Sequence, residues 1–312
     1  MELFKKMFGM LAVLSIGFIS CQKDFTIEDG PDPVEPPGVN DSIYLNKLYQ
    51  VDSVAGVNDS IFLTTFFYDG QKRVQLSTDS IKEAGGWFLF RTEKFQYSGA
   101  DTIPFKKVTY DYEKALGSAD PTAIDSTISY YQYNAAGRNI YDSTVEVEIE
   151  NDVPPYEYTS TITVKKYQYN GNNIYGEVMV MDEIGTLMRH GRDTSITDVN
   201  GNIIASKYYM VNGAVTDLVF TNSFTYDTKI DPFCRLSICR SFDVLPFEES
   251  YQLLQGKNNR TKNIILDSGG APYLEDNTVY TYNSINFPVK HQHTESDYPG
   301  IIFKAFYTYR AL

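Results

Sequence analysis

The chain has 312 residues, a formal net charge of −13, and an aromatic content of 14% that includes 25 tyrosines but one tryptophan. Such a negative charge argues against nucleic acid or anionic lipid headgroups as partners. The richness in tyrosine favours strands over helices, and the length fits one large β domain or two smaller ones.

The first twenty residues have the pattern of an export signal. Lys5 and Lys6 precede an apolar run, Met7–Ile19, that is shorter than a membrane-spanning helix needs. The run ends in Phe18-Ile19-Ser20-Cys21, which resembles a bacterial lipobox with Phe18 where leucine is usual. The resemblance implies that residues 1–20 are removed and that Cys21 carries the acyl chains, palmitate among them, of a membrane anchor. The alternative is an ordinary signal peptide with an incidental cysteine.

The next residues contain a candidate surface-export signal and a spacer. Gln22-Lys23-Asp24 resembles the short export signal of Bacteroidetes lipoproteins that face outward from the outer membrane; a periplasm-facing anchor is the alternative. Residues 28–38 read EDGPDPVEPPG, and such proline- and acid-rich sequence forms a semi-rigid spacer. We therefore expect an acidic tether at 21–40 and a single folded domain at 41–312.

An aromatic-x-tyrosine pair followed by a turn residue recurs along that domain. Residues two apart on a strand share one face, and the Asn, Asp or Gly that follows supplies a turn. The pairs are Phe66/Tyr68, Phe95/Tyr97, Tyr110/Tyr112, Tyr131/Tyr133, Tyr167/Tyr169, Phe224/Tyr226, Tyr280/Tyr282 and Tyr307/Tyr309. The pattern predicts an all-β fold, a large antiparallel meander of repeated hairpins that forms an extended sheet or a barrel-like structure. Tyr97, Tyr133 and Tyr169 are thirty-six residues apart, a period that we expect to hold two hairpins of ordinary strands.

Asparagine and aspartate mark further turns. Asn170-Gly171, Asn200-Gly201 and Asn212-Gly213 are typical of two-residue hairpin turns. Aspartate also precedes Ser or Thr repeatedly, at Asp79, Asp125, Asp142 and Asp193. These carboxylates could be calcium ligands or turn residues. Turn chemistry is favoured, because no group of them shows the loop spacing of a calcium site.

Alternation in the middle of the chain predicts strands with two different faces. Val145 and Val147 share one parity, while Thr144 and Glu146 share the other. In residues 161–169, Ile162 and Val164 oppose Thr163, Lys165, Tyr167 and Tyr169. The sheet should carry an aliphatic face and a Tyr/Thr/Lys face.

Two sets of motifs resemble known families. Asp198-Val-Asn-Gly-Asn202 and Tyr133-Asn-Ala-Ala-Gly-Arg138 resemble YD (Rhs-type) repeats, which build extended β structures. The closing stretch, from Phe224 through Tyr280-Thr-Tyr-Asn283 to Tyr309, is similar to uncharacterised Bacteroidetes lipoproteins with YD-like hairpins. The resemblance implies a β-rich, anchored lipoprotein, and it brings no established activity. A single short helix is predicted near 247–255, where Phe247, Tyr251 and Leu254 recur at helical spacing.

A few residues are candidates for binding chemistry. His291, His293 and Glu295 would share one strand face and could hold zinc; the alternative is an exposed polar face. Cys234 and Cys239 could form a disulfide if the chain bends between them. The candidate ligand-contact residues are Trp87, Tyr131, Tyr133, Tyr167 and Tyr169.

No nucleophile elbow, phosphate-binding loop or catalytic cysteine–histidine arrangement is visible, and no cofactor is expected. We therefore expect a lipid-anchored surface protein that is not an enzyme and that binds a glycan or a protein. The alternatives are a structural partner of another envelope protein, a glycan hydrolase whose carboxylates the sequence does not reveal, and a transmembrane barrel.

Overall fold

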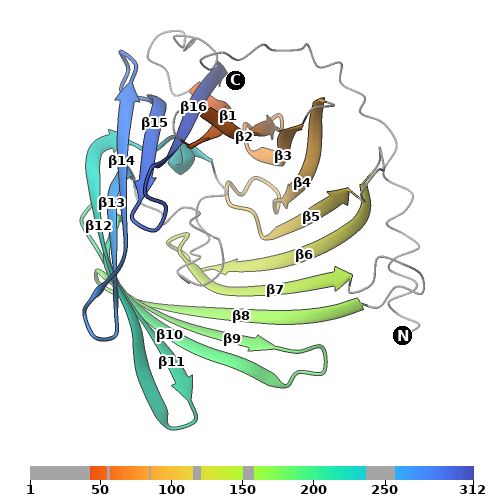
Figure 1. The fold of residues 1–312 in the computed structure, drawn as a ribbon. Helices are drawn as coiled ribbons and strands as arrows, with labels where there is room; N and C mark the ends of the chain where they lie inside the picture. Colours follow the sequence, from red (N-terminus) through yellow and green to blue (C-terminus); the bar gives the residue numbers. More distant parts are fainter. Residues whose placement is uncertain (1–42, 55–56, 84–85, 115–120, 150–157, 237–256) are drawn as a thin grey trace. The chain divides into compact units, whose positions relative to one another are not determined.

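The computed structural model describes residues 43–54, 57–83, 86–114, 121–149, 158–236 and 257–312, all within the compact unit Asp32–Leu312. In this part of the chain sixteen strands follow one another, with one short 3-10 helix, η1, at Pro232–Arg235 (Figure 1). The strands are β1 (Ile43–Val54), β2 (Val57–Tyr68), β3 (Val74–Glu83), β4 (Gly86–Gln96), β5 (Lys106–Lys114), β6 (Pro121–Tyr133), β7 (Asn139–Ile149), β8 (Tyr158–Asn170), β9 (Asn173–Met181), β10 (Leu187–Thr197), β11 (Ile203–Asn212), β12 (Val215–Ile230), β13 (Asn258–Asp267), β14 (Pro272–Tyr282), β15 (Pro288–Glu295) and β16 (Ile301–Ala311).

The strands form one closed antiparallel barrel. Each strand pairs with the next in sequence, and β1 pairs with β16 from Ile43↔Ala311 to Val54↔Ile301 to close the ring. The predicted all-β meander of hairpins is confirmed. The structure also decides between an extended and a closed sheet, and closure leaves none of these strands as an unpaired edge.

The recurring tyrosines close the hairpins at one end of the barrel, called here the tyrosine end. Near the end of an even-numbered strand, a tyrosine hydroxyl donates a hydrogen bond to a backbone carbonyl within two residues of the start of the preceding strand. The pairs are Tyr68 to Leu45, Tyr97 to Val74, Tyr133 to Pro104, Tyr169 to Asn139, Tyr226 to Ile203, Tyr280 to Arg260 and Tyr309 to Pro288, at 2.5–3.2 Å. In β10 the Thr197 hydroxyl takes the same role toward Asn172, at 3.2 Å.

The thirty-six-residue period was interpreted wrongly. Tyr97, Tyr133 and Tyr169 come at the ends of β4, β6 and β8, so one period holds two strands and therefore one hairpin, not two. The reason is strand length: β5 to β8 have 9 to 13 residues each, about twice the length common in globular proteins.

Six hairpin turns share one five-residue geometry. The first residue is Asp or Asn, and its side-chain oxygen accepts the backbone N–H groups of the third and fifth residues. These first residues are Asp69, Asn134, Asp182, Asp198, Asp267 and Asn283. The fourth residue has a φ of 63–83°, which suits Gly in four turns and is adopted by Lys72 and Asn286 in the others. Asn200-Gly201 thus belongs to a five-residue turn, whereas Gly171 and Gly213 do lie in two-residue turns.

The aspartates that precede Ser or Thr are not turn residues, and that prediction was wrong. Asp79, Asp125, Asp142 and Asp193 lie inside β3, β6, β7 and β10. A strand keeps its backbone groups in the ladder to its neighbours, so these carboxylates turn to side-chain partners instead; Asp79, for example, accepts a 2.6 Å hydrogen bond from the Thr64 hydroxyl.

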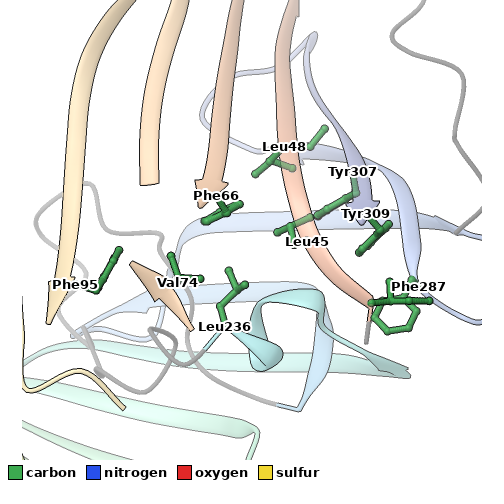
Figure 2. Close-up of a cluster of buried hydrophobic side chains, with 11 residues drawn as sticks. Leu45, Leu48, Phe66, Val74, Phe95, Leu236, Phe287, Tyr307 and Tyr309 are labelled. Atoms are coloured by element: carbon green, nitrogen blue, oxygen red, sulfur yellow. The ribbon is translucent and has the colours of Figure 1, made fainter. Parts of the chain in front are cut away.

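The largest apolar core lies at the tyrosine end and includes the segment after β12. Leu236 is 1% exposed and packs in one cluster with side chains of β1 to β4 and β16, as Figure 2 shows for Leu45, Phe66, Val74 and Tyr307. Phe233 of η1 packs edge-on against Phe66 and Tyr307, with ring centroids 6.3 and 6.4 Å apart. The segment after β12 thus ties the first strands to the last.

Several predictions fall on residues outside the described ranges: the signal peptide, Cys21, the tether at 21–40, Cys239 and the helix near 247–255. They stay predictions. Among the residues that the structure describes, no helix has the length and apolar character of a membrane span.

We expect Tyr169→Phe to lower the free energy of unfolding by about 1 kcal/mol, because the Asn139 carbonyl loses its 2.7 Å hydrogen bond while the ring stays in place. Urea denaturation followed by circular dichroism measures the change. The same substitution at Tyr175, which is 44% exposed, is the matched control and should have little effect. Equal effects at both positions would contradict a special role for the hydroxyl that closes the hairpin.

Candidate functional site

The inner face of the barrel can be followed strand by strand, because paired residues in neighbouring strands project from the same side of a sheet. Phe66 and Tyr307 both contact Phe233 and so mark that side on β2 and β16. From Phe66 the register continues through Ser77 and Glu93, and onward around the ring. The face so defined is called the inner face.

The inner face of β7 and β8 is the polar one. Thr144 pairs with Thr163 and Glu146 with Thr161 on the inner face, while Val145 pairs with Ile162 on the outer face. The predicted split into an aliphatic face and a Tyr/Thr/Lys face is therefore seen in these strands. The polar face points into the barrel, which is the reverse of the usual arrangement around an apolar core.

Charged pairs cross the inner face of β4 and β5. Arg91 Nε lies 2.5 Å from Asp111 Oδ1, and Lys107 Nζ lies 3.0 Å from Glu93 Oε1. Burial alone would raise the pKa of Glu93, but the Lys107 ammonium outweighs it and holds that pKa below its usual value. The acidic and basic side chains of these two strands therefore neutralise each other in ion pairs.

Asp79 lies on β3 beside these pairs, and its pKa is shifted in the opposite direction to that of Glu93. Burial raises its pKa to about 6 against the opposing effect of the Thr64 hydroxyl, which donates to the carboxylate. Asp79 therefore changes its charge close to neutral pH.

Asp193 on β10 is another buried acid of the inner face. It is 3% exposed, and burial raises its pKa to about 7. Its carboxylate lies over Gly176, where a Cβ atom would come within 1.8 Å of Asp193 Oδ1. The Tyr208 ring lies over Gly191 in the same way: a Cβ atom at position 191 would come within 2.5 Å of the Tyr208 hydroxyl oxygen. The two glycines make room for a carboxyl and a phenol on this part of the inner face.

Hydroxyl groups form a continuous surface on the inner face of β5 to β8, called here the hydroxyl wall. It consists of Thr109, Thr127, Ser129, Thr144, Thr161 and Thr163. Thr144 Oγ1 donates to Ser129 Oγ at 3.0 Å. Thr127, Thr144, Thr161 and Thr163 are half-buried, and Glu146 beside them is exposed. This wall can therefore offer hydrogen bonds to a molecule that enters from solvent.

The four tyrosines predicted to contact a ligand lie next to this wall, nearer the tyrosine end. Tyr133 and Tyr169 donate their hydroxyls to backbone carbonyls. Tyr167 is 4% exposed and donates to Asp142 Oδ2 at 3.4 Å. Tyr167 is therefore too enclosed to contact a ligand directly in this conformation. Tyr131 is half-buried and packs at 6.5 Å from the Tyr133 ring.

The three predicted zinc ligands are divided by the structure. His293 Nε2 lies 2.9 Å from Glu295 Oε1, and both side chains are on the inner face of β15. His291 instead places Nδ1 2.6 Å from the Tyr307 hydroxyl, and burial lowers its pKa to about 4. Asp276 on β14 pairs with Glu295 and brings a second carboxylate to His293.

Sequence reasoning missed Asp276, although part of the signal was present. The Asn283–Phe287 turn and the register shift between Thr281 and Tyr282 together set the pairing of β14 with β15, so that Thr278 pairs with His293 and Asp276 with Glu295. The turn alone would place Asp276 opposite Thr294, so both features are needed to bring the aspartate to the glutamate.

The remaining predicted residues lie apart from these groups. Trp87 is half-buried near the start of β4, where it pairs with Lys82. The backbone of Cys234 belongs to η1, whose turn supplies the kind of bend that a disulfide would need, but Cys239 lies outside the described residues. Cys21 lies outside them as well.

Comparisons with known proteins show the fold. No known protein family matches the sequence, and no curated protein is significantly similar to it. A porin-like protein from Bacteroides vulgatus aligns with a TM-score of 0.50 at 11% identity, over 86% of this chain and 99% of that one. A porin-like protein from Bacteroides uniformis aligns at 0.46 and 13% identity, over 85% and 96%. At these identities the likeness to the first shows a shared barrel architecture.

The buried Asp193 predicts a pH dependence of stability. Its pKa is about 7 in the fold and about 4 in an unfolded chain, so the fold binds the extra proton between these values. The stabilisation is complete below pH 4 and is lost as the pH rises toward 7. Relative to Asp193→Asn, the wild type should lose up to about 4 kcal/mol over this window. Urea denaturation at a series of pH values measures this difference. A parallel pair of curves for wild type and Asp193→Asn would refute the assignment.

Proposed function

We propose that the protein is a lipid-anchored outer-membrane protein, without enzymatic activity, whose barrel binds a glycan on its inner face. The hydroxyl wall is the observation that supports this most directly. Neighbouring threonine and serine hydroxyls act as both donors and acceptors, which matches the chemistry of sugar hydroxyls. Exposed Glu146 adds a charged acceptor, and the Tyr131 ring borders the wall on the side of the tyrosine end.

The comparison with solved structures agrees with a function that needs no catalytic centre. The similar protein from Bacteroides vulgatus is described as porin-like, and its barrel covers most of this chain. That description supports an outer-membrane location, and the lipobox-like Phe18-Ile19-Ser20-Cys21 supports a lipid anchor there.

The outer face favours a barrel held beside the membrane. Glu177 Oε1 lies 3.0 Å from His190 Nε2 and 3.5 Å from an Arg192 nitrogen, in the middle of β9 and β10. Lys262 and Glu275 form a 2.7 Å ion pair on β13 and β14. A lipid-facing Arg or Lys near the bilayer midplane costs roughly 2–4 kcal/mol, so these walls suit water better than hydrocarbon.

A second candidate is docking to another envelope protein. An apolar row crosses the outer face of β6 to β10 through Ile128, Val145, Ile162, Met181 and Leu187, which pair in that order. It ends at the β9–β10 turn, where Leu187, Met188 and Ile184 are 53%, 63% and 82% exposed. Clustered exposed apolar side chains of this kind are typical of interaction sites.

The glycan proposal is tested with the hydroxyl wall. Thr144→Val and Thr163→Val keep the side-chain shape and remove one hydroxyl each, so each should weaken glycan binding roughly fivefold, the equivalent of about one hydrogen bond. Binding is measured on a polysaccharide and oligosaccharide panel by affinity electrophoresis and calorimetry. Thr194→Val, on the outer face of β10, is the matched control and should bind as the wild type does.

Three outcomes bear against this reading. If no glycan binds while one envelope protein co-purifies with the chain, the docking candidate replaces it. If glycans bind but Thr144→Val, Thr163→Val and Thr194→Val are indistinguishable, the hydroxyl wall is not the site. Turnover of a polysaccharide would contradict a function without catalysis.

The anchor is tested by Cys21→Ala. We expect this variant to leave the membrane fraction without detergent, because the lipid chains alone hold the barrel there. Wild-type protein on intact cells should be cleaved by added protease, and changing Lys23-Asp24 should protect it. A Cys21→Ala variant that stays in the membrane after a high-salt wash would indicate a membrane-spanning barrel instead.

A further inference from the structure

Three metal-ligating side chains converge on the inner face of β14 and β15. Asp276, His293 and Glu295 each present one ligand atom, and these atoms lie within 4.8 Å of one another. The register explains the convergence: Asp276 pairs directly with Glu295, and His293 is two residues from Glu295 on the same face of β15. Two adjacent strands therefore supply the whole set.

The groups around these side chains already orient them. Thr278 Oγ1 lies 2.9 Å from His293 Nδ1, which leaves His293 Nε2 directed at Glu295. Asn263 Nδ2 donates to Asp276 Oδ2 at 3.0 Å. Ligating histidines and carboxylates are held in this way by hydrogen bonds on the side away from the ion.

Asp276 has a second feature that suits a cation site. The residue is 1% exposed, and its Oδ1 atom has no hydrogen-bond partner among the described residues. A buried carboxylate oxygen without a partner is costly, and a cation beside it would remove that cost.

We propose that Asp276, His293 and Glu295 bind a zinc ion. One imidazole nitrogen and two carboxylate oxygens are a ligand set that suits Zn²⁺, and three protein ligands leave a fourth position for water or a ligand atom. His293 and Glu295 are 16% and 13% exposed, so an ion can reach them from solvent. His291 is not among the three converging residues, and its Nδ1 lies 2.6 Å from the Tyr307 hydroxyl.

The outer face offers a matched comparison. His190 Nε2 also lies 3.0 Å from a glutamate, Glu177, as close as His293 lies to Glu295. There the third group is the cationic Arg192 and not a second carboxylate. A metal ion should prefer the Asp276 site, since Arg192 would repel it.

The test is calorimetric titration of the full-length, tag-free lipoprotein in detergent with zinc chloride. We expect saturable binding of about one ion per chain. Asp276→Asn and His293→Gln should each weaken it by roughly tenfold or more, and Thr278→Val, which frees the histidine ring, should weaken it by a similar factor. His190→Gln should bind zinc as the wild type does.

Cobalt provides a second readout that does not depend on affinity. Co²⁺ in the wild type should give a visible absorption band that Asp276→Asn lacks. Circular dichroism establishes that each variant is folded; if Asp276→Asn is not, Thr278→Val and His293→Gln decide the question. Absent or non-saturable zinc binding, or equal affinities in wild type, Thr278→Val and His293→Gln, would overturn the proposal. Equal loss in His190→Gln would also overturn it, since zinc would then bind to surface histidines in general.

Discussion

The pairing of β1 with β16 is the constraint on which the other features depend. Until Ile43 meets Ala311, the meander is an open sheet with two unpaired edges and no distinction between inside and outside. Closure gives polar side chains such as Thr163 an interior to line and places valines such as Val145 outside. The segment after β12 strengthens this junction, because Phe233 and Leu236 pack against side chains of both the first strands and the last strand. The inner face is therefore enclosed only because the first and last strands meet.

Away from the apolar core at the tyrosine end, the interior of this barrel holds polar groups in specific pairs. Buried charges are expensive unless they are paired or neutralised. Lys107 pairs with Glu93, whereas Asp193 is shifted toward its neutral form. At the tyrosine end the phenols combine both kinds of stabilisation, since Tyr309 packs against Phe287 and donates its hydroxyl to the Pro288 carbonyl. The charged rows need an exact register, so a slip of one residue along a strand would leave several carboxylates without partners.

Local sequence patterns predicted the strands and hairpins well. Contacts between residues far apart in the sequence were predicted poorly. The aromatic-x-tyrosine pairs and the turn residue after them gave the hairpins, because both signals act within a few residues. The role of the second tyrosine was not predictable, because Tyr169 and the carbonyl of Asn139 are thirty residues apart. The prediction that Asp79 and Asp193 are turn residues is wrong, because Asp-Ser and Asp-Thr favour turns locally but both residues lie inside strands. Asp79 finds its partner, Thr64, on the neighbouring strand, whereas Asp193 accepts a hydrogen bond from Ser195 on its own strand. The proposed zinc ligands were predicted in part: His293 and Glu295 lie on one strand and were expected, whereas Asp276 comes from the neighbouring strand.

The hydroxyl-to-carbonyl bonds at the tyrosine end have a consequence for how such a chain can grow. Each of them joins a strand to the one just before it, so every hairpin from β1–β2 to β15–β16 is completed by its own residues. Each hairpin with its turn is thus a self-contained unit of the barrel. Duplication or deletion of the gene segment for one hairpin would change the barrel by two strands and leave the hydroxyl-to-carbonyl bonds of the other hairpins in place.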